Sequence, residues 1–251
     1  MITYDNVKNR EKLFISLTGL TPAEFEALLP FFATAYDDYL AEKIEKQKNR
    51  ERVFGGGRKP ALRKTEDMLL FILFYFKLYP LQELTGFLFG MGQSQANLWI
   101  HKLSTVLRMT LESLNHLPER DPRELEKTLT EDGDAEFAID GTDRDIQRPK
   151  DNEKQKEFYN GRKKKHSVKN NVIVSVGDRK VKYLSGTCEG KKHDKKLCDE
   201  EQLVFPKDIG LWKDTGFQGY EPGGVNTHQP KKKPRGGELS IDEQIENSII
   251  S

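Results

Sequence analysis

The hydrophobic period of the sequence changes once along the chain, and this change limits the fold more than any other feature. Up to about residue 110, apolar residues recur at helical spacing. From about residue 134 the pattern alternates instead: Phe137 and Ile139 are separated by Ala138, and residues 172–176 form a nearly continuous apolar run. We therefore predict an all-α region followed by an α/β or α+β domain.

The second region can be divided further by its turn residues. Residues 172–176 and 181–185 are separated by Gly177 and Asp178, which predicts a hairpin. A helix is predicted over residues 191–203, and a further strand over 209–214. Strands, a helix and another strand together predict a mixed sheet.

The first region contains a clear helix start. Thr21, Pro22 and Glu24 combine a capping box with proline at the first helical position, which predicts a helix over residues 21–48. Three glycines at residues 55–57 lie between basic residues and predict a flexible break.

Three further helices are predicted after this break, over residues 67–78, 81–89 and 95–107. A short turn that contains glycine separates the last two. This arrangement fits a helix-turn-helix, and from the pattern alone a plain helical bundle fits it equally well.

The charges of the chain are segregated, although the formal net charge is only +1. Residues 161–169 carry five Lys or Arg and no acid, and residues 228–235 carry four and no acid. Basic stripes in a nearly neutral chain suit a protein that contacts phosphate groups. A solvated edge is the simpler interpretation of the first stripe.

Composition excludes several classes of protein. With 35% hydrophobic and 32% charged residues, the 251-residue chain is neither membrane-embedded nor disordered throughout. The most apolar run, residues 68–76, is well short of the roughly 20 residues that span a bilayer, so it predicts a buried helix. The N-terminus lacks an apolar signal core, and Cys188 and Cys198 are the only cysteines, so we expect no disulfide framework and a cytoplasmic location.

Two aspartates stand in similar positions. Asp140 and Asp214 each end a short apolar segment, and a glycine-containing turn follows each of them. Because ligands gather at strand ends in such sheets, the two carboxylates could converge on a hard divalent cation such as Mg²⁺. An ordinary Asp-Gly turn is the competing interpretation.

Cys188, His193 and Cys198 could also be zinc ligands, but their spacing matches none of the usual patterns.

Four motifs, taken in order, resemble one family. The stretches AIDGTDRDIQRPKDNEKQKEFYNGRKKKHSVKNNVIVS, EGKKHDKK, KDTGFQGYEP and QPKKKPRGGELS are similar to those of the DDE-type transposases of bacterial insertion sequences, in the branch related to the PIF/Harbinger transposons. The resemblance covers about residues 134–251. Residues 15–110 are more loosely similar to the helix-turn-helix region of the same proteins.

This resemblance implies an RNase H-like mixed-sheet catalytic domain, preceded by an all-α helix-turn-helix region. In the family three carboxylates hold two Mg²⁺ ions, for which Mn²⁺ can substitute. By motif, the first carboxylate is Asp140 and the second is Asp214. Asp143 and Asp145 are at most secondary, and the pair His193-Asp194 matches a supporting motif to which no role is assigned.

The sequence departs from the family at the third carboxylate. In the family this residue is a Glu beyond the PKKKPRG segment, in a stretch that reads like VEH. Glu238, Glu243 and Glu246 lie before that point, so none is carried over. We therefore expect a truncated or decayed copy, or the upstream product of a frameshifted gene, with impaired strand transfer by itself.

The predicted organisation is an N-terminal helical segment and linker (1–57), a helix-turn-helix region (58–118) and an RNase H-like DDE domain (134–251). The expected function is that of an insertion-sequence transposase which binds the transposon ends, acts on target DNA and assembles as a homo-oligomer. The alternatives are a truncated DNA-binding product that inhibits the full-length enzyme, and a metal-dependent nuclease unrelated to transposition. The residues expected to contact DNA are Gln95, Asn97, Arg162, Lys163, Lys164, Lys165, Lys231, Lys232, Lys233 and Arg235.

Overall fold

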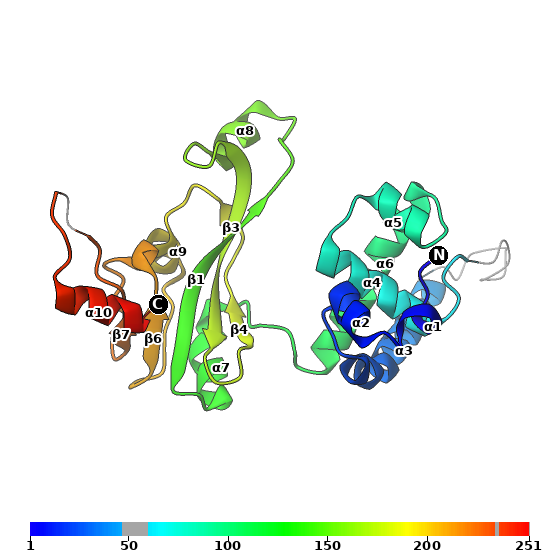
Figure 1. The fold of residues 1–251 in the computed structure, drawn as a ribbon, viewed down its shortest axis with the longest axis horizontal. Helices are drawn as coiled ribbons and strands as arrows, with labels where there is room; N and C mark the ends of the chain where they lie inside the picture. Colours follow the sequence, from blue (N-terminus) through cyan, green and yellow to red (C-terminus); the bar gives the residue numbers. More distant parts are fainter. Residues whose placement is uncertain (47–59, 234–235, 251) are drawn as a thin grey trace. The chain divides into compact units, whose positions relative to one another are not determined.

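The computed structural model describes residues 1–46, 60–233 and 236–250, which divide into two compact units (Figure 1). The first unit covers residues 1–117 and the second covers residues 118–251. The predicted change from helices to strands is confirmed, because the first strand begins at Glu136. The predicted break at residues 55–57 lies outside the described residues, and the division at residue 57 stays a prediction.

The described residues of the first unit are helical apart from turns and connections. The helices are α1 (Tyr4–Val7), α2 (Glu11–Thr18), α3 (Pro22–Glu45), α4 (Thr65–Leu78), α5 (Gln82–Leu88) and α6 (Gln93–Ser113).

Helix α3 begins as the sequence predicts. The backbone N–H of Glu24 donates to Thr21 Oγ1 at 3.3 Å, and the N–H of Thr21 donates to Glu24 Oε2 at 2.8 Å. Both halves of the capping box are therefore present, with Pro22 at the first helical position. The end of the predicted helix, residues 47 and 48, lies outside the described residues.

Helix α4 lies at the centre of the first core. Its residues from Met68 to Ile72 are all buried, as the sequence predicts, whereas Phe76 at the end of the apolar run is 52% exposed. Phe71 and Phe74 each contact the ring of Phe89, with centroid separations of 4.9 Å and 5.3 Å. In the described ranges, no helix is long and apolar enough to cross a membrane.

Helices α4, α5 and α6 form the predicted helix-turn-helix (Figure 1). The turn between α5 and α6 brings backbones together, since a Cβ on Gly86 would lie 2.6 Å from the carbonyl oxygen of Met91. Gly90 has a φ of +70°, in the left-handed region that favours glycine. These two glycines allow the tight connection that sets α6 against α5.

The described residues of the second unit combine a sheet with short helices. The strands are β1 (Glu136–Asp145), β2 (Tyr159–Asn160), β3 (Lys165–Ser175), β4 (Val181–Leu184), β5 (Cys188–Glu189), β6 (Gly210–Lys213) and β7 (Asn226–His228). The helices are η1 (Pro122–Glu124), α7 (Leu125–Asp132), α8 (Asn152–Phe158), α9 (Asp194–Glu201), η2 (Thr215–Phe217) and α10 (Ile241–Ile250).

The sheet is mixed, as the sequence predicts. Strand β3 is antiparallel to β1, and β4, β5 and β2 pair along the other edge of β3. On the opposite side, β6 is parallel to β1 and β7 is parallel to β6. The order β4-β3-β1-β6-β7, with α9 leading into β6, is the arrangement expected of an RNase H-like domain.

One face of the sheet carries the second core. Phe137 and Ile139 of β1 and Leu211 of β6 are buried, and they cluster with Leu129 of α7 and Cys198 of α9. The alternation of buried and more exposed residues along β1 explains the period of two in the sequence.

Strand β1 does not end at Asp140, and on this point the sequence-based prediction is wrong. Its pairing with β6 stops at Ile139, whereas its pairing with β3 continues to Asp145. Because β3 still supplies backbone partners, the Asp-Gly pair stays in extended structure instead of turning. Beyond Asp140 the two strands form an arm (residues 140–145 of β1 and 167–172 of β3), with α8 and β2 towards its end (Figure 1).

Candidate active site at the strand ends

Asp140 and Asp214 lie on neighbouring parallel strands. The register pairs Ile139 of β1 with Lys213 of β6, and the two aspartates are the next residues along each strand. Both are exposed, and both stand where the parallel pairing ends. The carboxyl end of parallel strands is where α/β sheets gather their ligands. The structure therefore brings together the two residues that the sequence singled out.

A backbone amide orients each carboxylate. The N–H of Gly141 donates to Asp140 Oδ1 at 2.8 Å, and the N–H of Gly216 donates to Asp214 Oδ1 at 2.8 Å. Exposed carboxylate oxygens are the ligands that Mg²⁺ takes in proteins, so this pair of donors fits a divalent cation. Within the described ranges, no group of three or more Asp, Glu, His or Cys side chains could hold a metal ion.

His193 and Asp194 form the start of α9. His193 is the N-cap and Asp194 is the first helical residue. Asp194 Oδ1 lies 2.8 Å from Nζ of Lys169, a buried residue of β3. The sequence motif singled out Asp194 but assigned it no role. It missed Lys169, because the partner of a lysine in a strand can be known only once the strand register is known.

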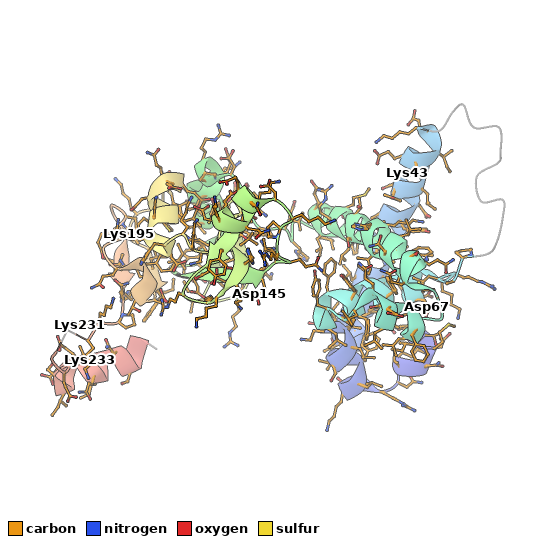
Figure 2. The ribbon with its side chains drawn as sticks, turned by 90° about the horizontal axis from the view of Figure 1, so that it is seen from above. Lys43, Asp67, Asp145, Lys195, Lys231 and Lys233 are labelled. Atoms are coloured by element: carbon orange, nitrogen blue, oxygen red, sulfur yellow. The ribbon has the colours of Figure 1, made fainter. Side chains whose placement is uncertain are left out.

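Asp143 and Asp145 pair with the first basic stripe. Lys163 forms an ion pair with Asp143, and Lys165 Nζ lies 2.7 Å from Asp145 (labelled in Figure 2). These contacts tie the last residues of β1 to the start of β3 and to the turn before it. Their assignment as secondary residues stays a prediction.

Lys231 and Lys233 of the second basic stripe lie beside α10 (Figure 2). The backbone N–H of Lys231 donates to Asn247 Oδ1 at 2.7 Å, and Asn247 Nδ2 donates to the carbonyl oxygen of Lys231 at 2.9 Å. Lys232 and Lys233 are exposed, whereas Arg235 lies outside the described residues.

Two glutamates near the end of the chain contact these lysines. Glu238 Oε1 lies 3.5 Å from Lys233 Nζ, and Glu243 Oε1 lies 3.9 Å from Lys231 Nζ. The side chain of Glu246 lies outside the described part of the chain. Neither Glu238 nor Glu243 joins the strand-end aspartates in a group that could hold a metal.

The two amides expected to read bases differ in their surroundings. Gln95 is exposed on α6, whereas Asn97 Nδ2 donates to Gln82 Oε1 of α5 at 3.1 Å. Asn97 therefore helps to hold α6 against α5. Base contact by either residue stays a prediction.

The cysteines do not suit a zinc site. Burial raises the pKa of the Cys198 thiol to about 12, and Asn171 Nδ2 lies 3.0 Å from its sulfur. Zinc binds the thiolate, and this surrounding favours the neutral thiol.

Comparison with known proteins gives a family match within each unit. Residues 139–251 match the family model described as DDE superfamily endonuclease, and residues 60–113 match the helix-turn-helix of DDE superfamily endonuclease. The chain is 24% identical over 214 residues to a protein named "Probable transposase for insertion sequence element IS702" from Microchaete diplosiphon, and the match covers 85% of this chain and 73% of that protein. No solved structure gives a significant match.

A helix-turn-helix followed by an RNase H-like sheet, with aspartates where the parallel pairing of β1 and β6 ends, is the arrangement expected of a DNA-processing endonuclease. The two family matches have the same order along the chain. Residues 139–251 are thus similar to DDE superfamily endonucleases, and most of the chain is similar to an insertion-sequence transposase; a DDE site implies a divalent metal.

Proposed function

We propose that the chain binds the ends of its insertion sequence and cleaves DNA in a metal-dependent reaction at Asp140 and Asp214. The observation that supports this most is the parallel register of β1 and β6. It places Asp140 and Asp214 at the same level of the sheet, each one residue beyond the last parallel pair. Three parts of the proposal rest on the motif resemblance: binding to the transposon ends, action on target DNA and the relation to the PIF/Harbinger branch.

The two aspartates would hold the cations, for which Mg²⁺ is the expected ion and Mn²⁺ a substitute. When bound, a pair of such ions activates the attacking oxygen and stabilises the leaving oxygen of a phosphodiester. Asp140 and Asp214 serve this chemistry by presenting carboxylates that the N–H groups of Gly141 and Gly216 already orient. The family's third carboxylate has no counterpart grouped with them among the described residues. We therefore expect weak cleavage and strand transfer from this chain by itself.

DNA contact is assigned to both units. In the first unit, α6 would enter the major groove, with Gln95 as the exposed amide near its start. In the second unit, the basic stripes would contact phosphates next to the cleaved bond. Self-association on DNA would bring two transposon ends together.

A second candidate function is DNA binding without cleavage, by which the chain would inhibit a complete transposase. The observation that favours it is that, in the described ranges, no group of three or more Asp, Glu, His or Cys side chains is arranged to hold a metal ion. Both functions require binding to the ends, and only the first requires cleavage.

The test uses a plasmid that carries the DNA flanking the gene. We expect slow, Mg²⁺-dependent nicking in that DNA, lost in Asp140→Ala and Asp214→Ala but kept in Asp199→Ala, which removes an exposed aspartate of α9. Binding of the flanking DNA should survive in all three variants. Binding without nicking by the unmodified protein would favour the second function, and nicking without preference for the flanking DNA would contradict the transposase proposal.

A further inference from the structure

The carboxylate of Asp194 lies between the β1 backbone just after Asp140 and the turn just after Asp214. A Cβ placed on Gly141 would be 2.1 Å from Asp194 Oδ1, and a Cβ placed on Gly216 would be 2.9 Å from Asp194 Oδ2. Gly141 follows Asp140 directly, and Gly216 is the amide donor to Asp214. A side chain at position 141 or 216 would therefore collide with the Asp194 carboxylate in its present position.

Asp194 is also close to the second aspartate of the site. The Cβ position on Gly216 that lies 2.9 Å from Asp194 Oδ2 lies 2.9 Å from Asp214 Oδ1 as well. The same carboxylate thus adjoins the backbone beside Asp140 and the side chain of Asp214.

Strand β3 holds Asp194 in this position. Lys169 Nζ lies 2.8 Å from Asp194 Oδ1 and also donates to the carbonyl oxygen of Lys192 at 3.2 Å. Asn171 Nδ2 donates to the backbone carbonyl oxygen of Asp194 at 3.2 Å. The side chains of Lys169 and Asp194 are only 11% and 20% exposed, so solvent screens this ion pair less than the surface pairs of the chain.

We propose that Asp194, anchored by Lys169, is a positioning residue that sets the spacing between the β1 backbone just after Asp140 and the turn after Asp214. It acts through Gly141 and Gly216, and it thereby tunes the affinity of the paired aspartates for a divalent cation. This inference rests on the proposed function of the site. Residues that orient metal ligands from outside typically change metal affinity by about 10–100-fold when they are replaced.

The first test is a calorimetric titration of the full chain with Mn²⁺ alone. We expect Asp194→Asn to weaken Mn²⁺ binding about tenfold. Asp199→Asn makes the same chemical change on the same helix, at an exposed residue paired with Lys195, and should leave the affinity unchanged. An unchanged affinity in Asp194→Asn would overturn the inference.

The second test measures steric coupling and does not depend on the first variant. Gly141→Ala should weaken Mn²⁺ binding in the normal background, because the added methyl group meets the Asp194 carboxylate. In an Asp194→Ala background, the same substitution should cause no further loss. Gly223→Ala, at a glycine with nothing within 4 Å of its added Cβ, is the matched control. Equal losses from Gly141→Ala in both backgrounds would contradict the inference.

Failure of this inference can be separated from failure of the proposed function. If Asp140→Asn weakens Mn²⁺ binding and Asp194→Asn does not, the positioning role is wrong and the metal site stands. If Asp140→Asn and Asp214→Asn leave Mn²⁺ binding unchanged, the proposed site itself is wrong.

Discussion

At the scale of single residues, ion pairs divide the first basic stripe. Lys163 and Lys165 pair with Asp143 and Asp145 across the arm, whereas Arg162 and Lys164 are exposed at the turn before β3. The side chain of Asp143 is only 14% exposed, so release of Lys163 to a phosphate would leave a largely buried carboxylate without its cation. We infer that Arg162 and Lys164 are the better phosphate contacts.

This division predicts different salt dependences of DNA binding. Arg162→Ala or Lys164→Ala should each flatten the slope of log K against log salt by about 0.9, the contribution of one phosphate contact. Lys163→Ala should leave the slope nearly unchanged. Binding isotherms at several salt concentrations measure it, and an equal loss of slope in all three variants would contradict the assignment.

Asp134 gives a prediction for pH. Its carboxylate accepts hydrogen bonds from Ser175 Oγ and from the N–H groups of Gly177 and Glu136, and these bonds, that of Ser175 first, lower its pKa. A carboxyl whose pKa is lower in the folded state stabilises the fold above its unfolded pKa of about 3.9, and this contribution is lost as the pH falls through the folded value.

Asp134→Asn should therefore destabilise the protein at pH 7. Its deficit relative to the unmodified chain should shrink as the pH falls below about 4. Urea unfolding at a series of pH values measures both effects, and a deficit that does not depend on pH would contradict this origin.

At the scale of elements, the sequence is most informative where local chemistry determines structure. The capping box of Thr21 and Glu24 and the period of two around Phe137 depend on near neighbours, and both predictions are confirmed. The extension of β1 past Asp140 was not predictable, because it depends on pairing with residues of β3 that lie far along the chain. The place of Asp194 beside Gly141 depends on the same long-range register.

The connection between α5 and α6 predicts a large effect of one methyl group. Gly86→Ala would set a Cβ 2.6 Å from the carbonyl oxygen of Met91, a backbone atom of the turn between α5 and α6. We expect a loss of about 1–3 kcal/mol in the free energy of unfolding, as for other overpacked sites. Gly92→Ala, where nothing lies within 4 Å, should have a much smaller effect in the same urea titration, and equal losses would contradict this account.

At the scale of the whole molecule, the chain folds into two units, and each unit has its own hydrophobic core. The sequence predicts this separation because the period of its hydrophobic residues changes between the units. It also singles out Asp140 and Asp214, since each follows a short apolar segment. It could not predict Lys169, whose role depends on the contact between β3 and the start of α9.

The central claim is that Asp140 and Asp214 hold the same cation site, and cleavage of the protein backbone by bound iron tests it most directly. Fe²⁺ in place of Mg²⁺, with ascorbate and peroxide, generates hydroxyl radicals that cut the chain near the metal. We predict cuts around residues 140 and 214 together, both lost in Asp140→Asn and competed by Mg²⁺. Cuts at only one of the two positions, or cuts that persist in Asp140→Asn, would contradict a shared site.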